Sequence, residues 1–145
     1  SVVFAEHHPY RDILPIVEQA QGETLEALLL DGARRLVEAL GQRTDLLNLM
    51  FTEIVEFKGA NLPALSQEII PRALHFMQRV YALGGARLRA IPPPVIARAY
   101  LGLFFSFYMT EKIIPPDYRA LFGGNTLEQF VQIFLHGILE EEASI

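Results

Sequence analysis

Residues 95–114 read VIARAYLGLFFSFYMTEKII, and they are the most informative part of the chain about its architecture. At about 100° per residue, its apolar side chains lie nearly all the way around a helix, so the helix needs neighbours on every side. The uninterrupted run of apolar and small residues covers positions 99–109, with Arg98 and Lys112 flanking it. This run is shorter than the about 20 residues that a membrane-spanning helix requires. We therefore predict a buried helix of a protein outside the membrane, partly covered by a second copy of the chain.

The composition points to one domain that does not bind nucleic acid itself. The chain has 145 residues, is 51% hydrophobic and carries a net charge of −5, with its 12 Lys and Arg residues scattered. The absence of cysteine excludes disulfides and cysteine-bound metals, and it agrees with a cytoplasmic protein. The chain begins at Ser1 without an initiator methionine and shows no signal peptide. We expect a cytoplasmic fragment, with residues 1–145 forming a single domain.

Helical periodicity accounts for the whole chain, and glycine or proline separates the segments. Thr24 is a predicted N-cap, Gly41 a helix end, and Pro92-Pro93-Pro94 the start of the all-round apolar helix. The other predicted segments cover residues 10–20, about 44–57 closed by Gly59, 61–84 with Asn61 as N-cap, and a last helix from about residue 125. Strand signals are absent. The sequence therefore predicts an all-α bundle of about five to six helices.

Two local features concern the start of the last helix and the regularity of the 61–84 helix. Asn125 with Glu128, or Thr126 with Gln129, matches a capping box at the start of the last helix, after a loop that ends in Gly123-Gly124. Pro71 lies in the middle of the 61–84 helix, where proline removes a backbone donor. We expect either a tolerated kink at Pro71 or a kink beside a cavity.

The helix of residues 95–114 has two opposite stripes. Val95, Ala99, Gly102 and Ser106 form one stripe, which we call the small stripe. Its small side chains let another helix approach closely. The other stripe, which we call the tyrosine stripe, contains Tyr100, Phe104, Tyr108 and Glu111. We predict that the small stripe meets the last helix or its symmetry mate and that the tyrosine stripe faces a cavity, with the swapped assignment as the alternative. The candidate dimer-interface residues are Val95, Ala99, Gly102, Ser106, Leu127, Phe130, Val131, Phe134, Gly137 and Ile138.

Aromatic and methionine side chains on the inward faces of several helices form a candidate ligand pocket. The same residues are equally consistent with ordinary core packing. Glu111 is a candidate polar anchor or partner of a tyrosine hydroxyl, and the alternative is a solvated carboxylate. The candidate ligand-binding residues are Met50, Phe51, Ile54, Phe76, Met77, Tyr81, Tyr100, Phe104, Phe107, Tyr108 and Glu111.

Four segments carry a resemblance to the C-terminal domain of the tetracycline-repressor-like (TetR) family of bacterial regulators. They are TDLLNLMFTE (44–53), ARLR (86–89) after the long helix, PVIARAYLGL (94–103) and LEQFVQIFLHGIL (127–139). The resemblance implies an effector-binding and dimerisation domain whose last two long helices form a four-helix dimer seam. It also implies that operator DNA is bound by an N-terminal helix-turn-helix domain absent from this chain. Pro71 departs from the family pattern.

The sequence therefore predicts the small-molecule-sensing and dimerisation domain of a TetR-like transcriptional regulator, with a repressor expected. Its partners are a second copy of the chain and a small apolar or aromatic effector that shifts the DNA-binding competence of the full-length dimer. The alternative is a dimeric helical-bundle interaction module without a small-molecule ligand.

We expect no cofactor, no metal and no enzyme activity. His75 and His136 fall on polar helix faces, and His7-His8 lacks metal-site spacing. No G-x-S-x-G motif is present.

Overall fold

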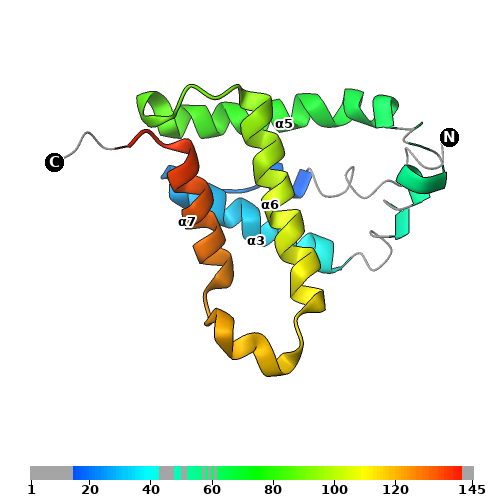
Figure 1. The fold of residues 1–145 in the computed structure, drawn as a ribbon. Helices are drawn as coiled ribbons and strands as arrows, with labels where there is room; N and C mark the ends of the chain where they lie inside the picture. Colours follow the sequence, from blue (N-terminus) through cyan, green and yellow to red (C-terminus); the bar gives the residue numbers. More distant parts are fainter. Residues whose placement is uncertain are drawn as a thin grey trace.

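The computed structural model describes residues 15–42, 48–49, 52–56, 58, 60 and 62–141. This part of the chain is an all-α bundle without a strand, which confirms the predicted fold class (Figure 1). Its elements are α3 (Leu25–Gly41), the π-helical turn η1 (Thr52–Glu56), α5 (Leu62–Gly84), the 3-10 turn η2 (Gly85–Arg87), α6 (Pro93–Ile113), the 3-10 segment η3 (Pro116–Phe122) and α7 (Thr126–Ile138). Residues 15–18 form a helical turn before α3.

Helix α3 is the centre of the bundle because it contacts α5, α6 and α7. The Ala27 N–H donates to the Thr24 hydroxyl over 3.1 Å, so Thr24 is the N-cap, and the helix ends at Gly41, both as predicted. Its apolar residues recur every three or four positions and are buried. They are Leu25, Leu28, Leu29, Ala33, Leu36 and Leu40.

Helix α5 crosses one end of the bundle (Figure 1). It is continuous through Pro71, whose side chain is exposed. It ends at Gly84, as predicted. The following Gly85 has φ +54°, a left-handed conformation that glycine adopts without a Cβ penalty. The predicted Asn61 cap, the Gly59 end and half of the predicted 44–57 helix lie outside the described residues, as do residues 10–14 of the first predicted segment.

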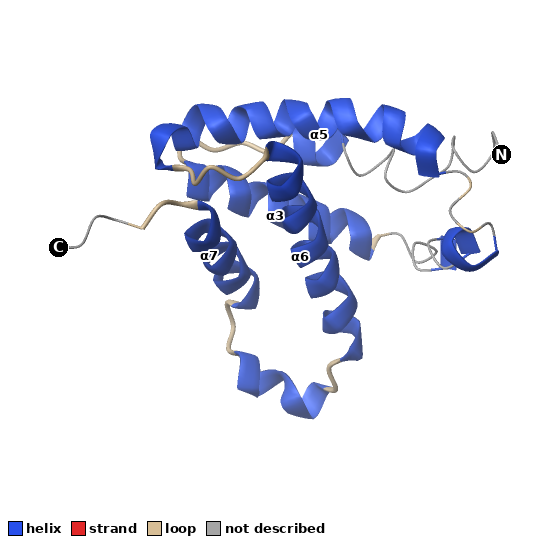
Figure 2. Ribbon diagram, turned by 45° about the horizontal axis from the view of Figure 1, so that its top comes forward, coloured by secondary structure: helices blue, strands red, loops and turns tan. Residues whose placement is uncertain are grey.

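Helices α6 and α7 pack against each other, and η3 joins them at the end remote from α5 (Figures 1 and 2). We call this projecting part, residues 105–130, the arm. Pro93 is the first residue of α6 and Pro92 its N-cap, so the proline run starts the helix as predicted. The predicted loop before α7 is instead largely the 3-10 segment η3.

The start of α7 corrects the predicted capping box. Asn125 is the N-cap residue, but its side chain makes no capping hydrogen bond. The Thr126 hydroxyl donates to the Phe122 carbonyl over 3.3 Å, and Glu128 pairs with Arg34 of α3 over 2.9 Å. A tertiary partner therefore takes Glu128, and a carbonyl four residues earlier in the chain takes the Thr126 hydroxyl, instead of the capping bonds that the local pattern assigned to these side chains.

The chain between α5 and α6 closes the other end of α7. The Arg89 N–H donates to the Ile138 carbonyl over 2.8 Å, and the Arg89 guanidinium donates to the Gly137 carbonyl over 2.7 Å. These bonds satisfy carbonyls that the last turn of a helix leaves without partners. An isolated antiparallel bridge joins Leu88 to Leu139 beside them.

Candidate ligand and interface sites

The tyrosine stripe of α6 lies in the core. Phe104 has 0% exposure, and Tyr100 and Tyr108 are also buried. The Tyr100 ring stacks on Phe76 at a centroid distance of 5.6 Å and contacts Phe104 edge-on at 4.9 Å. A third ring, that of Phe134, lies 5.3 Å from Tyr100. Aromatic packing therefore fills the space beside the first half of the stripe.

The Tyr100 hydroxyl joins α6 to α3. It donates to the Leu29 carbonyl over 2.7 Å, and burial raises the pKa of Tyr100 above its ordinary value of 10.0. Helix α3 can approach this closely because position 32 is glycine. A Cβ atom at Gly32 would lie 2.6 Å from the Tyr100 hydroxyl oxygen. The partner of this buried hydroxyl is thus a backbone carbonyl and not Glu111.

The other candidate ligand residues are divided between core and arm. Phe76 and Met77 are buried in the core, and the half-buried Tyr81 donates to the Ile91 carbonyl over 3.0 Å. Phe107 and Glu111 lie together in the arm. Met50, Phe51 and the side chain of Ile54 lie outside the described part of the structure.

A void of about 20 Å³ lies where residues 17–18 meet α5 and α6. Two predicted ligand residues, Phe76 and Tyr100, line it together with Val17 and Leu101. This volume is far below the about 300–1,000 Å³ of typical ligand pockets. A ligand of ordinary size can therefore enter only if the walls of this void move, residues 17–18 among them.

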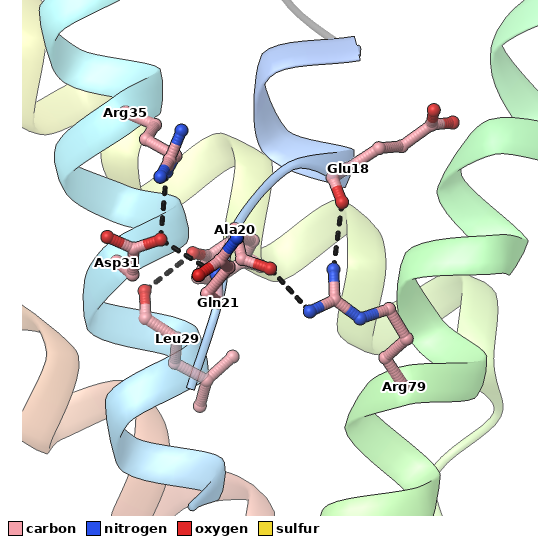
Figure 3. Close-up of polar contacts among 8 residues, drawn as sticks. Glu18, Ala20, Gln21, Leu29, Asp31, Arg35 and Arg79 are labelled. Atoms are coloured by element: carbon pink, nitrogen blue, oxygen red, sulfur yellow. Dashed lines mark hydrogen bonds and ion pairs between the residues drawn. The ribbon is translucent and has the colours of Figure 1, made fainter. Parts of the chain in front are cut away.

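Polar contacts hold residues 15–21 in place (Figure 3). The Arg79 guanidinium of α5 donates to the Glu18 carbonyl over 2.8 Å and to the Ala20 carbonyl. On α3, Asp31 accepts the Gln21 N–H and the Arg35 side chain, each over 2.8 Å. The Gln21 N–H is the main reason that the pKa of Asp31 lies below its ordinary value, and Arg35 adds to the effect. We call these contacts the polar clamp.

A larger hollow, of about 300 Å³, lies in the arm between α6, η3 and α7. Its apolar walls include Phe107, Phe122 and Leu127, and its charged walls are Glu111, Arg119 and Glu128. The Arg119 guanidinium donates to the Glu111 carboxylate and to the Glu111 carbonyl, each over 3.0 Å. This hollow, rather than the tyrosine stripe, provides space of ligand size.

The small stripe of α6 is exposed. Val95 is 53% exposed, and Ala99, Gly102 and Ser106 are exposed as well. A Cβ atom added at Gly102 would meet nothing within 4 Å. This face of α6 is therefore open to another helix.

On α7 the structure places the predicted interface residues differently. Val131, Phe134 and Ile138 are buried within this chain, so their side chains are not available to a partner. Leu127 and Phe130 are half-buried, and Gly137 is exposed. The sequence analysis missed Ile133, which is 67% exposed. Its spacing of three residues from Phe130 and four from Gly137 could have identified the outer face of α7.

No group of three or more His, Asp or Glu residues in the described ranges could hold a metal ion. His75 and His136 are exposed, as predicted. None of the described helices has the length and apolar character to cross a membrane.

Comparisons with protein-family models, with curated proteins and with solved structures find no match for this chain. The features that bear on function are therefore the hollow in the arm, the void beside Tyr100 and the exposed face of α6.

Proposed function

We propose that this chain is the small-molecule-sensing and dimerisation domain of a TetR-like transcriptional regulator, acting as a repressor. The observation that carries the proposal is the exposed small stripe of α6, together with the exposed Ile133 and Gly137 on the contacting helix α7. Small side chains allow two helices to pack closely, and the two adjoining helices of each copy would form a four-helix seam. Stable interfaces of this kind bury about 1,600 Å² in total.

The proposed effector is a small apolar or aromatic molecule that enlarges the void beside Phe76 and Tyr100. Since the polar clamp holds residues 15–21 over this void, entry would require the clamp to open. A ligand that binds the open arrangement better shifts the population towards it. In the full-length regulator, this change would reach operator DNA through a helix-turn-helix domain on the N-terminal side.

The closed packing of the tyrosine stripe favours a second candidate function, a dimeric interaction module with no small-molecule ligand. A thermal-shift screen with apolar and aromatic compounds separates the two functions. A compound that raises the melting temperature through linkage supports the sensor. Failure of the whole library supports the module.

Dimerisation is tested by sedimentation equilibrium of Gly102→Arg against the unchanged chain. The open space at Gly102 lets a single copy accept arginine, whereas an unpaired charge in the seam should weaken the dimer at least about 30-fold. Gln78→Arg adds the same charge to the exposed surface of α5 and should leave the dimer unchanged. A chain that is monomeric at high concentration contradicts the proposal.

A further inference from the structure

The hollow in the arm is separate from the buried aromatic residues of the tyrosine stripe and from the void under residues 15–21, and Glu111 at the end of that stripe lines it. Its volume of about 300 Å³ falls at the lower end of the range for small-molecule pockets. Neither the packed core nor the exposed small stripe of α6 accounts for it. The chemistry of its walls indicates which ligand fits.

Two aromatic rings from different elements form part of the wall. The Phe107 ring of α6 is buried and packs edge-on against Phe130 at a centroid distance of 5.2 Å, so its position is fixed. Phe122 of η3 is 49% exposed and has no comparable burial. An apolar or aromatic body can contact both residues, and aromatic faces also attract cations.

The charged walls carry more negative than positive groups. Glu111 and Glu128 contribute carboxylates, and Arg119 is the only cationic side chain of the wall in the described part of the chain. Each carboxylate pairs with a guanidinium through one oxygen, Glu111 through Oε2 with Arg119 and Glu128 through Oε1 with Arg34. The Glu128 backbone N–H and then Arg34 lower the pKa of Glu128, so this carboxylate is charged at neutral pH.

Arg119 can yield its place to a ligand at little cost. Its side chain is 52% exposed, and ion pairs between exposed side chains contribute little to stability. The nearby Lys112 does not compete with a ligand for the Glu111 carboxylate, because its ammonium group lies over the Tyr108 ring at 4.6 Å from the centroid.

We propose that this hollow binds an organic ammonium ion with an aromatic or apolar body. The body contacts Phe107 and Phe122, and the ammonium group donates hydrogen bonds to the Glu111 carboxylate. Charge-assisted hydrogen bonds of this kind are stronger than neutral ones. An anionic ligand of the same shape is disfavoured by the two carboxylates. The inference does not depend on dimerisation or on the effector proposed for the void.

The test is titration of the whole chain with 2-phenylethylammonium, followed by NMR chemical shifts and calorimetry at low salt. The neutral 2-phenylethanol and the anionic 3-phenylpropionate serve as comparison probes. We expect the ammonium probe to bind about tenfold more tightly than the alcohol. The carboxylate probe should not bind measurably.

Two variants and one matched control locate the binding. Glu111→Gln should weaken binding of the ammonium probe by about tenfold, since it removes the charge that the ammonium group contacts. Phe122→Ala should weaken it by about three- to fivefold through loss of an aromatic wall on an exposed segment. Glu38→Gln removes an equal charge from the exposed surface of α3 and should bind like the unchanged chain. Circular dichroism melting curves verify folding of each variant.

The inference is overturned if the ammonium probe does not bind, or if all three probes bind equally. It is also overturned if Glu111→Gln and Phe122→Ala, both folded, bind as tightly as the unchanged chain. Sedimentation equilibrium of the same samples separates this result from the proposed function. A dimer that does not bind the probe contradicts only the hollow, and a monomer that binds it contradicts only the dimeric regulator.

Discussion

The two halves of α6 are both largely apolar, but they have different surroundings. In the first half, Ile96, Tyr100 and Phe104 are enclosed by neighbouring helices of the bundle. The second half continues into the arm (Figure 2). There, Ile113 and η3 expose large apolar side chains, with Leu121 at 79% exposure. The comparison shows that a helix with apolar side chains all around it needs neighbours on every side. The number of neighbouring helices then decides how many of those side chains are buried.

The largest effect is expected where the first half of α6 is packed most closely. Phe104→Ala removes a fully buried ring and should lower the free energy of unfolding by about 3–5 kcal/mol. Urea unfolding followed by circular dichroism measures this loss. A cost below about 1 kcal/mol would show that this half of α6 is packed as loosely as the arm.

Substitutions at Gly32 and Tyr100 test how closely α3 and α6 approach each other in the core. Gly32→Ala places a methyl group 2.6 Å from the Tyr100 hydroxyl oxygen, and such overpacking should cost about 1–3 kcal/mol. In a Tyr100→Phe background the hydroxyl is absent, so the additional cost of Gly32→Ala should fall by about 1 kcal/mol or more. Urea unfolding of the four proteins in a double-mutant cycle measures this coupling, and purely additive costs would contradict the close approach of α3 and α6.

A substitution in the polar clamp should lower the stability of the fold by a smaller amount, and this amount should depend on pH. The pKa of Asp31 is lower when the chain is folded, so the folded chain binds a proton less tightly than the unfolded chain. The stabilisation by Asp31 is therefore complete above its ordinary pKa of 3.8 and is lost as pH falls through the lower folded value. Asp31→Asn should cost about 1 kcal/mol at neutral pH through the weakened bond to Gln21.

Thermal melting of Asp31→Asn and of the unchanged chain from neutral pH down to pH 3 tests this prediction. The difference in melting temperature should narrow towards the acid end of the series. Asn is the matched substitution because it keeps the size and an oxygen acceptor while removing the charge. A difference that stays constant with pH would show that the Asp31 charge does not stabilise the clamp.

The smallest effect is expected at the tip of the arm. Leu121→Ser replaces a side chain that is exposed, and surface changes of this kind usually alter stability by less than about 0.5 kcal/mol. Chemical unfolding at a concentration where the chain is monomeric measures the change. A large loss would mean that the arm is packed like the core, which would remove the contrast between the two halves of α6.

Several elements were predictable because their signals are local. Thr24, Gly41, Gly84 and the proline run before α6 mark helix ends through backbone geometry and short-range hydrogen bonds, and the structure places the ends there. The capping box at Asn125 did not form: the Asn125 side chain makes no capping hydrogen bond, and Glu128 pairs with a distant residue, Arg34 on α3. The sequence contains no signal that these two residues meet.

The candidate sites depended more strongly on the tertiary structure. Helical spacing correctly separated the tyrosine stripe of α6 from its small stripe, because both follow from 3.6 residues per turn. Spacing did not show that Phe76 and Phe134 would fill the space beside Tyr100, or that Phe107 and Glu111 would line a hollow with η3. On α7, the inward orientation of Val131, Phe134 and Ile138 was set by packing against this chain's own helices.

Local sequence patterns were enough to predict that the described chain is helical, where most of its helices begin or end, and that α6 needs neighbours around its whole circumference. The packing of the folded chain set which side of α6 those neighbours cover, which face stays open and where a hollow remains. The physical reason is that helix formation depends on interactions within a few residues, whereas burial and cavities depend on side chains that are distant in sequence and meet only when the chain folds.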